Sequence, residues 1–161
     1  MNIIECSIKM KEERRDHYKQ LAEFAKDKDL KRLASLLAEA NNELIEQISK
    51  LKKIPEVTSS PETELSEDVC VFIPRFDAQH PEVGLKSDSD AYLHVVKEIQ
   101  DAIQFLEQLG VQTESNQVKT IYRKLAEIER GHLSVVENIY SFVEDPRTYL
   151  EWGEFSNLKS L

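Results

Sequence analysis

Glycine and proline are scarce in this chain, at four and five of its 161 residues. Proteins built from many short strands need both residues for their turns, so this scarcity favours long helices. No apolar run approaches the roughly 20 residues that cross a membrane. The first residues also lack the charged start and the apolar stretch of a signal peptide. We therefore expect a soluble, cytoplasmic protein that does not act at a membrane.

The chain also has few cysteines, and its positively charged residues are outnumbered by negatively charged ones. The two cysteines, Cys6 and Cys70, form no CxxC pair, and we expect both to be reduced thiols in the core. The chain has 21 Lys and Arg against 30 Asp and Glu, a formal charge of −9 at pH 7, which makes nucleic acid an unfavourable partner. No Gly-rich phosphate loop, serine elbow or Cys–His pair is present, so nucleotide binding and hydrolysis have no support.

The clearest pattern in the sequence is the helical spacing of its apolar residues. It predicts four helices at about residues 1–26, 29–53, 88–110 and 115–144, within a single domain spanning residues 1–161. The two halves align without a gap at an offset of 88 residues, which places Leu37 over Leu125. A helix pair repeated once is typical of a bundle of two hairpins, so the predicted fold class is all-α.

Residues 54–87, between the two predicted hairpins, hold four of the five prolines and are too long for a turn. A helix of about 25 residues is about 37 Å long, a span that roughly 11–12 extended residues cover. We therefore expect a crossover along the length of the bundle, which leaves the second and third helices parallel. Its segment 69–73 is apolar and β-prone, and we expect it to pack on the bundle or on a second subunit.

The chain ends in a predicted tail at residues 145–161, which follows a helix stop at Asp145-Pro146. Its aromatic residues are Tyr149, Trp152 and Phe155. Exposed aromatic clusters are rare on monomers. We therefore expect these side chains to cover the open end of the bundle or a dimer interface.

Two polar residues interrupt the apolar seam of the last predicted helix. Glu129 and His132 are three positions apart, so they share a helix face with the apolar residues around them and should point inward. An inward carboxylate and imidazole one turn apart are the ligands that metal sites in helix bundles use. On an arbitrary helix, the same two residues are more often a satisfied pair in the core.

The hairpin repeat, the crossover and two local phrases together resemble the rubrerythrin branch of the ferritin-like family. The phrases are Leu125-Ala-Glu-Ile-Glu-Arg-Gly-His-Leu133 and Tyr18-Lys-Gln-Leu-Ala-Glu-Phe-Ala-Lys-Asp27, and the resemblance covers about residues 8–143. It implies a ferritin-like antiparallel four-helix bundle and a homodimer. It also implies oxidoreductase or iron-handling chemistry at a pair of carboxylate-bound iron ions.

The family's site takes one Glu from each of helices one and three, and a Glu-x-x-His from each of helices two and four. Glu129 and His132 match the fourth-helix pair. The other four positions fall on residues that are neither carboxylates nor imidazoles: Lys11, Asn41, Leu44 and Ile99. Two iron ions need several carboxylates, both as ligands and to offset charge, so a complete two-metal site is not expected.

Glu98 is the weaker candidate ligand, one residue before the expected third-helix position. A shift of one residue rotates a helical side chain by about 100°. We therefore expect Glu98 to turn away from the seam and to join His94 and Asp101 in a surface cluster.

The mismatch leaves two functions open, and whether the protein is an enzyme stays undecided. In the first, the bundle keeps a metal-linked redox role, with Glu129 and His132 as ligands to iron or to a single weakly bound ion. In the second, Lys11 replaces the metal electrostatically and forms a buried polar cluster with Glu129, Asn41 and His132. The bundle would then be a dimeric binding or scaffold protein. Lys11 facing Glu129 across the bundle favours the second function.

Overall fold

The protein is all-α over residues 1–145, which are the residues described by this computed structural model. This described part contains helices and no strand, and its isolated β-bridge joins Asn2 to Glu64. None of its helices is long and apolar enough to cross a membrane. The aromatic residues of the predicted tail, Tyr149, Trp152 and Phe155, lie outside the described residues.

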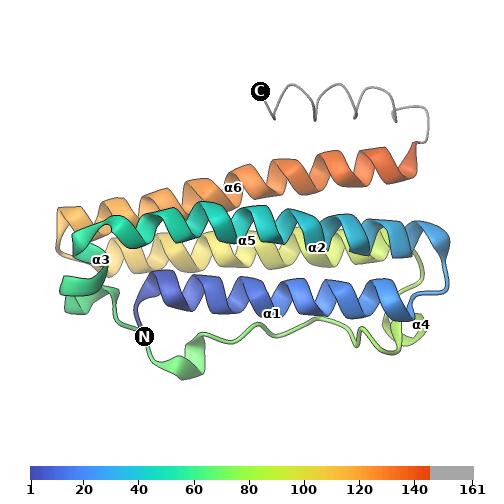
Figure 1. Cartoon of the computed structure of the whole chain (residues 1–161), viewed down its shortest axis with the longest axis horizontal. Coiled ribbons are helices and arrows are strands. Elements are labelled where there is room, and N and C mark those ends of the chain that lie inside the picture. Colours follow the sequence, from blue (N-terminus) through green and yellow to red (C-terminus); the bar gives the residue numbers. More distant parts are fainter. Residues whose placement is uncertain (146–161) are drawn as a thin grey trace.

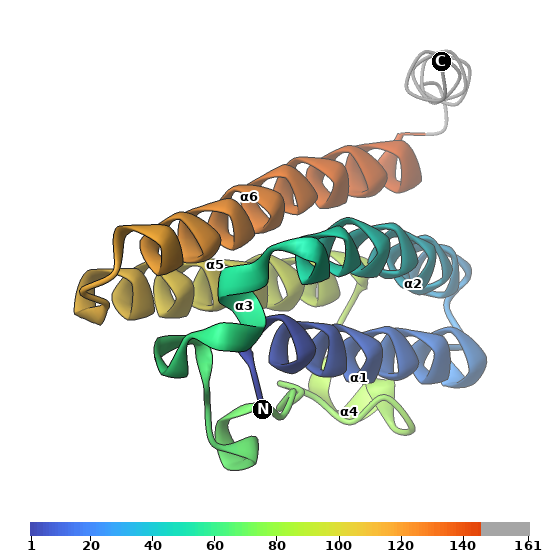
Figure 2. The same ribbon diagram turned by 60° about the vertical axis from the view of Figure 1, so that its left-hand side comes forward.

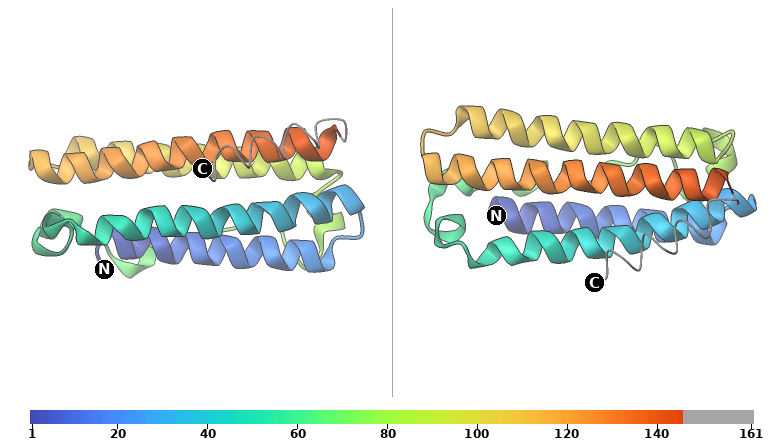
Figure 3. Two further views of the ribbon diagram at one scale, coloured as in Figure 1. Left: turned by 45° about the horizontal axis from the view of Figure 1, so that its top comes forward. Right: turned by 90° about the horizontal axis from the view of Figure 1, so that it is seen from above.

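Four long helices lie side by side and account for most of the described chain (Figure 1). They are α1 (Ile3–Phe24), α2 (Lys28–Ser49), α5 (Asp88–Gln112) and α6 (Asn116–Glu144). Each overlaps one of the four predicted ranges. Short turns join α1 to α2 and α5 to α6, and the two resulting hairpins form two layers (Figure 3).

Each long helix begins at a polar side chain that caps its first turn. Each capping residue accepts a hydrogen bond from the backbone N–H three positions further on. The capping residues are Asn2, Asp27, Ser87 and Ser115. Such caps satisfy N–H groups that have no partner within the helix. The helix starts are therefore defined by local sequence, independently of the packing.

The connection between the hairpins runs along α1 from one end of the molecule to the other, as Figures 1 and 2 show. Consequently α2 and α5 run in the same direction. The connection is built from short helical turns joined by extended chain. These turns are η1 (Lys50–Lys53), α3 (Pro55–Ser59), η2 (Pro61–Thr63), η3 (Glu67–Val69) and α4 (Pro81–Gly84).

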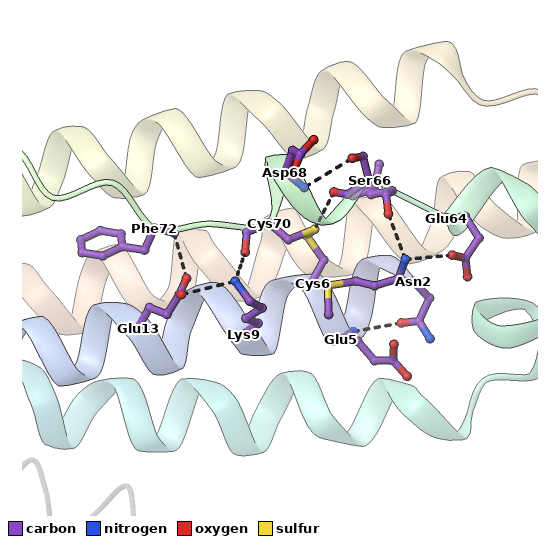
Figure 4. The surroundings of a disulfide bond; sticks show 12 residues. Asn2, Glu5, Cys6, Lys9, Glu13, Glu64, Ser66, Asp68, Cys70 and Phe72 are labelled. Atoms are coloured by element: carbon purple, nitrogen blue, oxygen red, sulfur yellow. Dashed lines mark hydrogen bonds and ion pairs between the residues drawn. A yellow bond between two sulfur atoms is a disulfide. The ribbon is translucent and has the colours of Figure 1, made fainter.

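A disulfide between Cys6 of α1 and Cys70 fastens the connection to the bundle (Figure 4). The prediction that both cysteines are reduced thiols is therefore wrong. Their separation of 64 residues gave no sign that the crossover would bring Cys70 back onto the first helix. Disulfides persist mainly in oxidising compartments, so this bond is evidence against the expected cytoplasmic location, which stays a prediction.

Residues 70–76, which we call the strap, are also held to α1 by polar and ring contacts. Lys9 Nζ donates to the Cys70 carbonyl oxygen at 2.7 Å, and the Phe72 backbone N–H donates to Glu13 Oε1 at 3.1 Å (Figure 4). The ring of His17 lies 5.5 Å from that of Phe72 and 4.8 Å from that of Phe76, centroid to centroid. The strap thus occupies one flank of α1, but Val69, Val71 and Ile73 of the predicted apolar segment 69–73 are exposed.

The helices pack unevenly around the bundle. α2 packs closely against both α1 and α6, and α5 packs against α6, whereas the backbones of α1 and α5 stay further apart. The buried apolar side chains form two clusters, one around Leu21, Leu37 and Val136 and the other around Ile4, Ile48 and Leu125. The positions between the two clusters are polar, and they form the candidate site.

Candidate functional site

A layer of buried polar side chains crosses the bundle at mid-height, between the two apolar clusters. We call it the polar layer. Its members are Lys11 and Arg14 from α1, Asn41 from α2, and Glu129 and His132 from α6. Each occupies a seam position that an apolar residue would otherwise fill. Buried polar groups of this kind are costly unless they pair with one another.

Lys11 and Glu129 form an ion pair in this layer. Lys11 Nζ lies 2.6 Å from Glu129 Oε1, and the two side chains are 7% and 2% exposed. Burial acts to raise the pKa of Glu129, but the cations Lys11 and Arg14 outweigh it and hold that pKa below its usual value. Burial lowers the pKa of Lys11, and Glu129 limits the decrease. Glu129 is therefore ionised at neutral pH and serves as the counter-ion of Lys11.

Arg14 is a second buried cation, at 2% exposure, and sequence reasoning gave it no role. Its Nε donates to Asn41 Oδ1 at 3.1 Å, while Asn41 Nδ2 donates to the Leu37 carbonyl oxygen at 3.0 Å. Asn41 is thus linked by hydrogen bonds to Arg14 and to its own helix. Arg14 Nη2 is buried without a hydrogen-bond partner among residues 1–145. The sequence feature that could have identified Arg14 is its position on the α1 seam, one turn after Lys11.

The carboxyl group of Glu98 faces α1, so its predicted place in a surface cluster is wrong. The Tyr18 hydroxyl donates to Glu98 Oε2 at 3.4 Å, and Oε1 is buried with no partner in the described part of the chain. Burial raises the pKa of this carboxyl group to about 7, although Arg14 and Arg75 oppose the rise. The wide spacing of α1 and α5 explains the error, because a side chain just off the seam still lies between the two helices.

The two residues expected to accompany Glu98 do not join it. Asp101 is exposed and accepts a hydrogen bond from Arg75 of the strap at 2.6 Å. The ring of His94 lies 5.7 Å from that of Phe76, centroid to centroid. Asp101 and His94 therefore contact the strap, while Glu98 lies deeper, where its carboxyl group reaches Tyr18 of α1 and also interacts with the Arg75 backbone.

His132 lies beside the ion pair as a neutral imidazole. Burial, reinforced by the nearby Arg14, lowers the pKa of His132 to about 3. Its Nε2 is buried and has no hydrogen-bond partner among the residues that the structure describes. His132 therefore carries no charge at neutral pH and keeps one ring nitrogen unused.

The chemistry of the polar layer does not suit a two-metal centre, because the layer holds two cations, Lys11 and Arg14, and a single carboxylate, Glu129. Over residues 1–145, no three His, Cys, Asp or Glu side chains gather in a group suited to a metal ion. The ammonium group of Lys11 sits at the Glu129 carboxylate, where a bound cation would need that oxygen. The candidate ligands Glu129 and His132 remain neighbours on α6, while the carboxyl group of Glu98 on α5 contacts Tyr18 of α1.

A cavity of about 460 Å³ lies beside the polar layer, between α1, α5 and the strap. Its apolar lining includes Met10, Phe72, Phe105 and Leu106. Lys11, Arg14 and Glu98 line it as well, so it reaches the polar layer. Ile73, which is 79% exposed, places the other end of the lining at the molecular surface. The cavity therefore connects solvent to the buried charges.

Protein-family models, curated proteins and solved structures were each compared with this chain, and none of them matches it. Membership of the ferritin-like family therefore stays a prediction from the residues themselves.

Proposed function

We propose that this protein is a ferritin-like antiparallel four-helix bundle in which the Lys11–Glu129 ion pair replaces the metal centre. On this proposal the bundle acts by binding and carries out no iron-dependent oxidation. The ion pair is the observation that supports the proposal most directly, because its 2.6 Å contact places a cation of the protein itself on the carboxylate of the Glu-x-x-His pair. The cavity next to it provides the space that a binding function needs.

Three further observations support this proposal. Asn41, at the second-helix Glu position of the family, is occupied by hydrogen bonds to Arg14 and to the Leu37 carbonyl oxygen. Arg14 adds a second positive charge to the layer, which further disfavours a divalent cation there. The low pKa of His132, about 3, leaves its imidazole neutral, so His132 adds no third positive charge beside Lys11 and Arg14.

The test is the metal content of the purified protein after anaerobic loading with ferrous iron and desalting. We expect wild-type protein to retain no more iron than the control variant Glu129→Gln/His132→Gln. Chelator should leave the free energy of unfolding of wild-type protein unchanged. Two iron ions per chain would overturn the proposal. A single ion per chain that is lost in Glu129→Gln would overturn it too, in favour of the single-ion site.

A further inference from the structure

The cavity between α1, α5 and the strap has the size and the polarity of a small-molecule site. Its volume of about 460 Å³ lies within the roughly 300–1,000 Å³ of ligand pockets in proteins. It occupies the flank where the α1 and α5 backbones stay apart. The strap covers this flank and is fastened there by the Cys6–Cys70 disulfide. The cavity therefore exists because the helices leave this side of the bundle open.

The walls of the cavity are apolar while its inner end is charged. Met10 and Phe105 are half-buried, and Leu106 is buried in the apolar cluster around Ile4, Ile48 and Leu125. Arg14 and Lys11 bring two cations to the inner end. A ligand that matches both surfaces has an apolar body and one polar end.

The unused hydrogen-bonding capacity at the inner end identifies the polar group. Arg14 Nη2 is buried and lacks a partner within the described residues. A buried donor without a partner is unfavourable and rare in native structures, so it calls for an explanation. A guanidinium group presents donors in a planar fork that fits a carboxylate. An incoming carboxylate would supply the acceptor that Nη2 lacks once the Arg14 side chain turns that atom towards the cavity.

The balance of charge also favours an anionic ligand. Glu129 offsets the charge of Lys11 through their direct contact. The other buried cation, Arg14, donates to the neutral amide group of Asn41 and forms no ion pair with any of residues 1–145. Glu98 Oε2 accepts instead from the Tyr18 hydroxyl. A bound monoanion would therefore give Arg14 a direct counter-ion.

We propose that this cavity binds a small amphipathic monocarboxylate. Its carboxylate pairs with Arg14, and its apolar tail lies along Met10, Phe105 and Leu106. This inference rests on the proposed metal-free binding function and names the class of ligand. Decanoate is the probe, because it joins one carboxylate to an unbranched apolar chain. Decanol is its matched neutral analogue, since it has the same chain and no charge.

The first experiment is isothermal titration of the full-length protein with each probe at neutral pH, before and after treatment with chelator. We expect one decanoate per chain, with decanol at least about tenfold weaker, because an uncharged group loses the charge-assisted hydrogen bonds to Arg14. Equal affinity for decanoate and decanol would overturn the anionic specificity. Tighter binding of decyltrimethylammonium than of decanoate would overturn it as well.

Substitutions locate the two ends of the ligand. Arg14→Gln should weaken decanoate about tenfold and leave decanol unchanged, whereas its matched control Arg15→Gln should change neither. Arg15 is on the same helix and contacts Asp16 and Asn42. Ala102→Trp, which fills the cavity, should abolish binding of both probes in protein shown to be folded by circular dichroism. Binding that survives Ala102→Trp would place the ligand elsewhere and overturn the proposal.

Chelator separates a failure of this inference from a failure of the metal-free function. Unchanged decanoate binding in the presence of chelator supports both proposals. Decanoate binding that requires retained iron would overturn both, because the carboxylate would then be a ligand to the metal. No decanoate binding in protein that also retains no iron would overturn the ligand class and leave the metal-free bundle standing.

Discussion

The Lys11–Glu129 contact is a buried ion pair, and removal of one partner should cost far more than removal of both. Lys11→Met leaves Glu129 buried without its counter-ion, so we expect the free energy of unfolding to fall by about 3–5 kcal/mol. Lys11→Met/Glu129→Leu replaces the pair by apolar side chains of similar size and should be near neutral or stabilising. Urea denaturation measures both. Equal stability of the single and the double variant would show that the two charges do not depend on each other.

Glu98 should make the stability of the protein depend on pH. Burial raises its pKa in the folded protein from 4.5 to about 7, so between these values the folded protein keeps a proton that the unfolded chain releases. This contribution is constant below about pH 4.5, and the free energy of unfolding falls as pH rises towards 7. The variant Glu98→Gln has no carboxyl group at this position, so this contribution is absent from it. The stability of wild type relative to this variant should fall by on the order of 2–3 kcal/mol across that window.

Urea denaturation at a series of pH values measures this difference. Glu12→Gln serves as the matched control, because Glu12 is an exposed carboxylate on α1. The buried histidines His17 and His132 titrate in all three proteins and cancel in the comparison. Parallel stability curves for wild type and Glu98→Gln would contradict the buried position of this carboxyl group.

Residues of the site differ in how far sequence predicts them. Helical periodicity and the repeat offset align Asn41 with Glu129, because both depend only on spacing along the chain. That Lys11 lies at the same level was implied by the family resemblance. The contact between Arg14 and Asn41 depends on the reach of a long side chain, which spacing does not report. Glu98 is missed because a helical projection assumes closely packed neighbours, and α5 lacks one on the side of α1.

Among the elements, the strap depends on its covalent anchor. The Cys6–Cys70 disulfide closes a loop with a sequence separation of 64 residues, and cross-links of this kind stabilise small proteins by about 2–4 kcal/mol. Reduction of wild-type protein should lower the free energy of unfolding by that amount. It should also speed hydrogen exchange at the Phe72 amide, which is bonded to Glu13. Denaturation and exchange, each with and without dithiothreitol, measure these effects.

Cys6→Ala/Cys70→Ala is the control for this prediction. Its stability and its exchange at Phe72 should not respond to dithiothreitol and should match those of reduced wild-type protein. Wild-type stability that is indifferent to the reductant would contradict a stabilising role for the disulfide.

The long helices are the elements that sequence predicts best. Apolar spacing over more than 20 residues identifies each of them, and the ends differ from the predicted ranges by a few residues because caps such as Asn2 and Asp27 set the boundaries. The second predicted helix shows the largest difference, since α2 ends at Ser49 and continues as a 3-10 turn. The position of the strap on α1 depends on contacts with distant residues, so local composition could not specify it.

At the scale of the whole molecule, the polar layer and the cavity have a common origin. α2 closes the bundle against both α1 and α6, which leaves the flank between α1 and α5 to the strap. The layer meets this flank at Arg14 and Glu98, so the least tightly packed side of the molecule gives access to its most polar interior. The homodimer implied by the family resemblance stays a prediction.

The polar layer also affects how the two hairpins recognise each other during folding. The α1–α2 hairpin contributes the two cations, Lys11 and Arg14, and the α5–α6 hairpin contributes the two carboxylates, Glu98 and Glu129. Two copies of the α1–α2 hairpin, placed face to face, would bury four cations, and two copies of the α5–α6 hairpin would bury two Glu129 carboxylates without a counter-ion. Although the halves are similar in sequence, each is therefore complementary to the other and repelled by its own copy, which guides the chain towards pairing unlike halves.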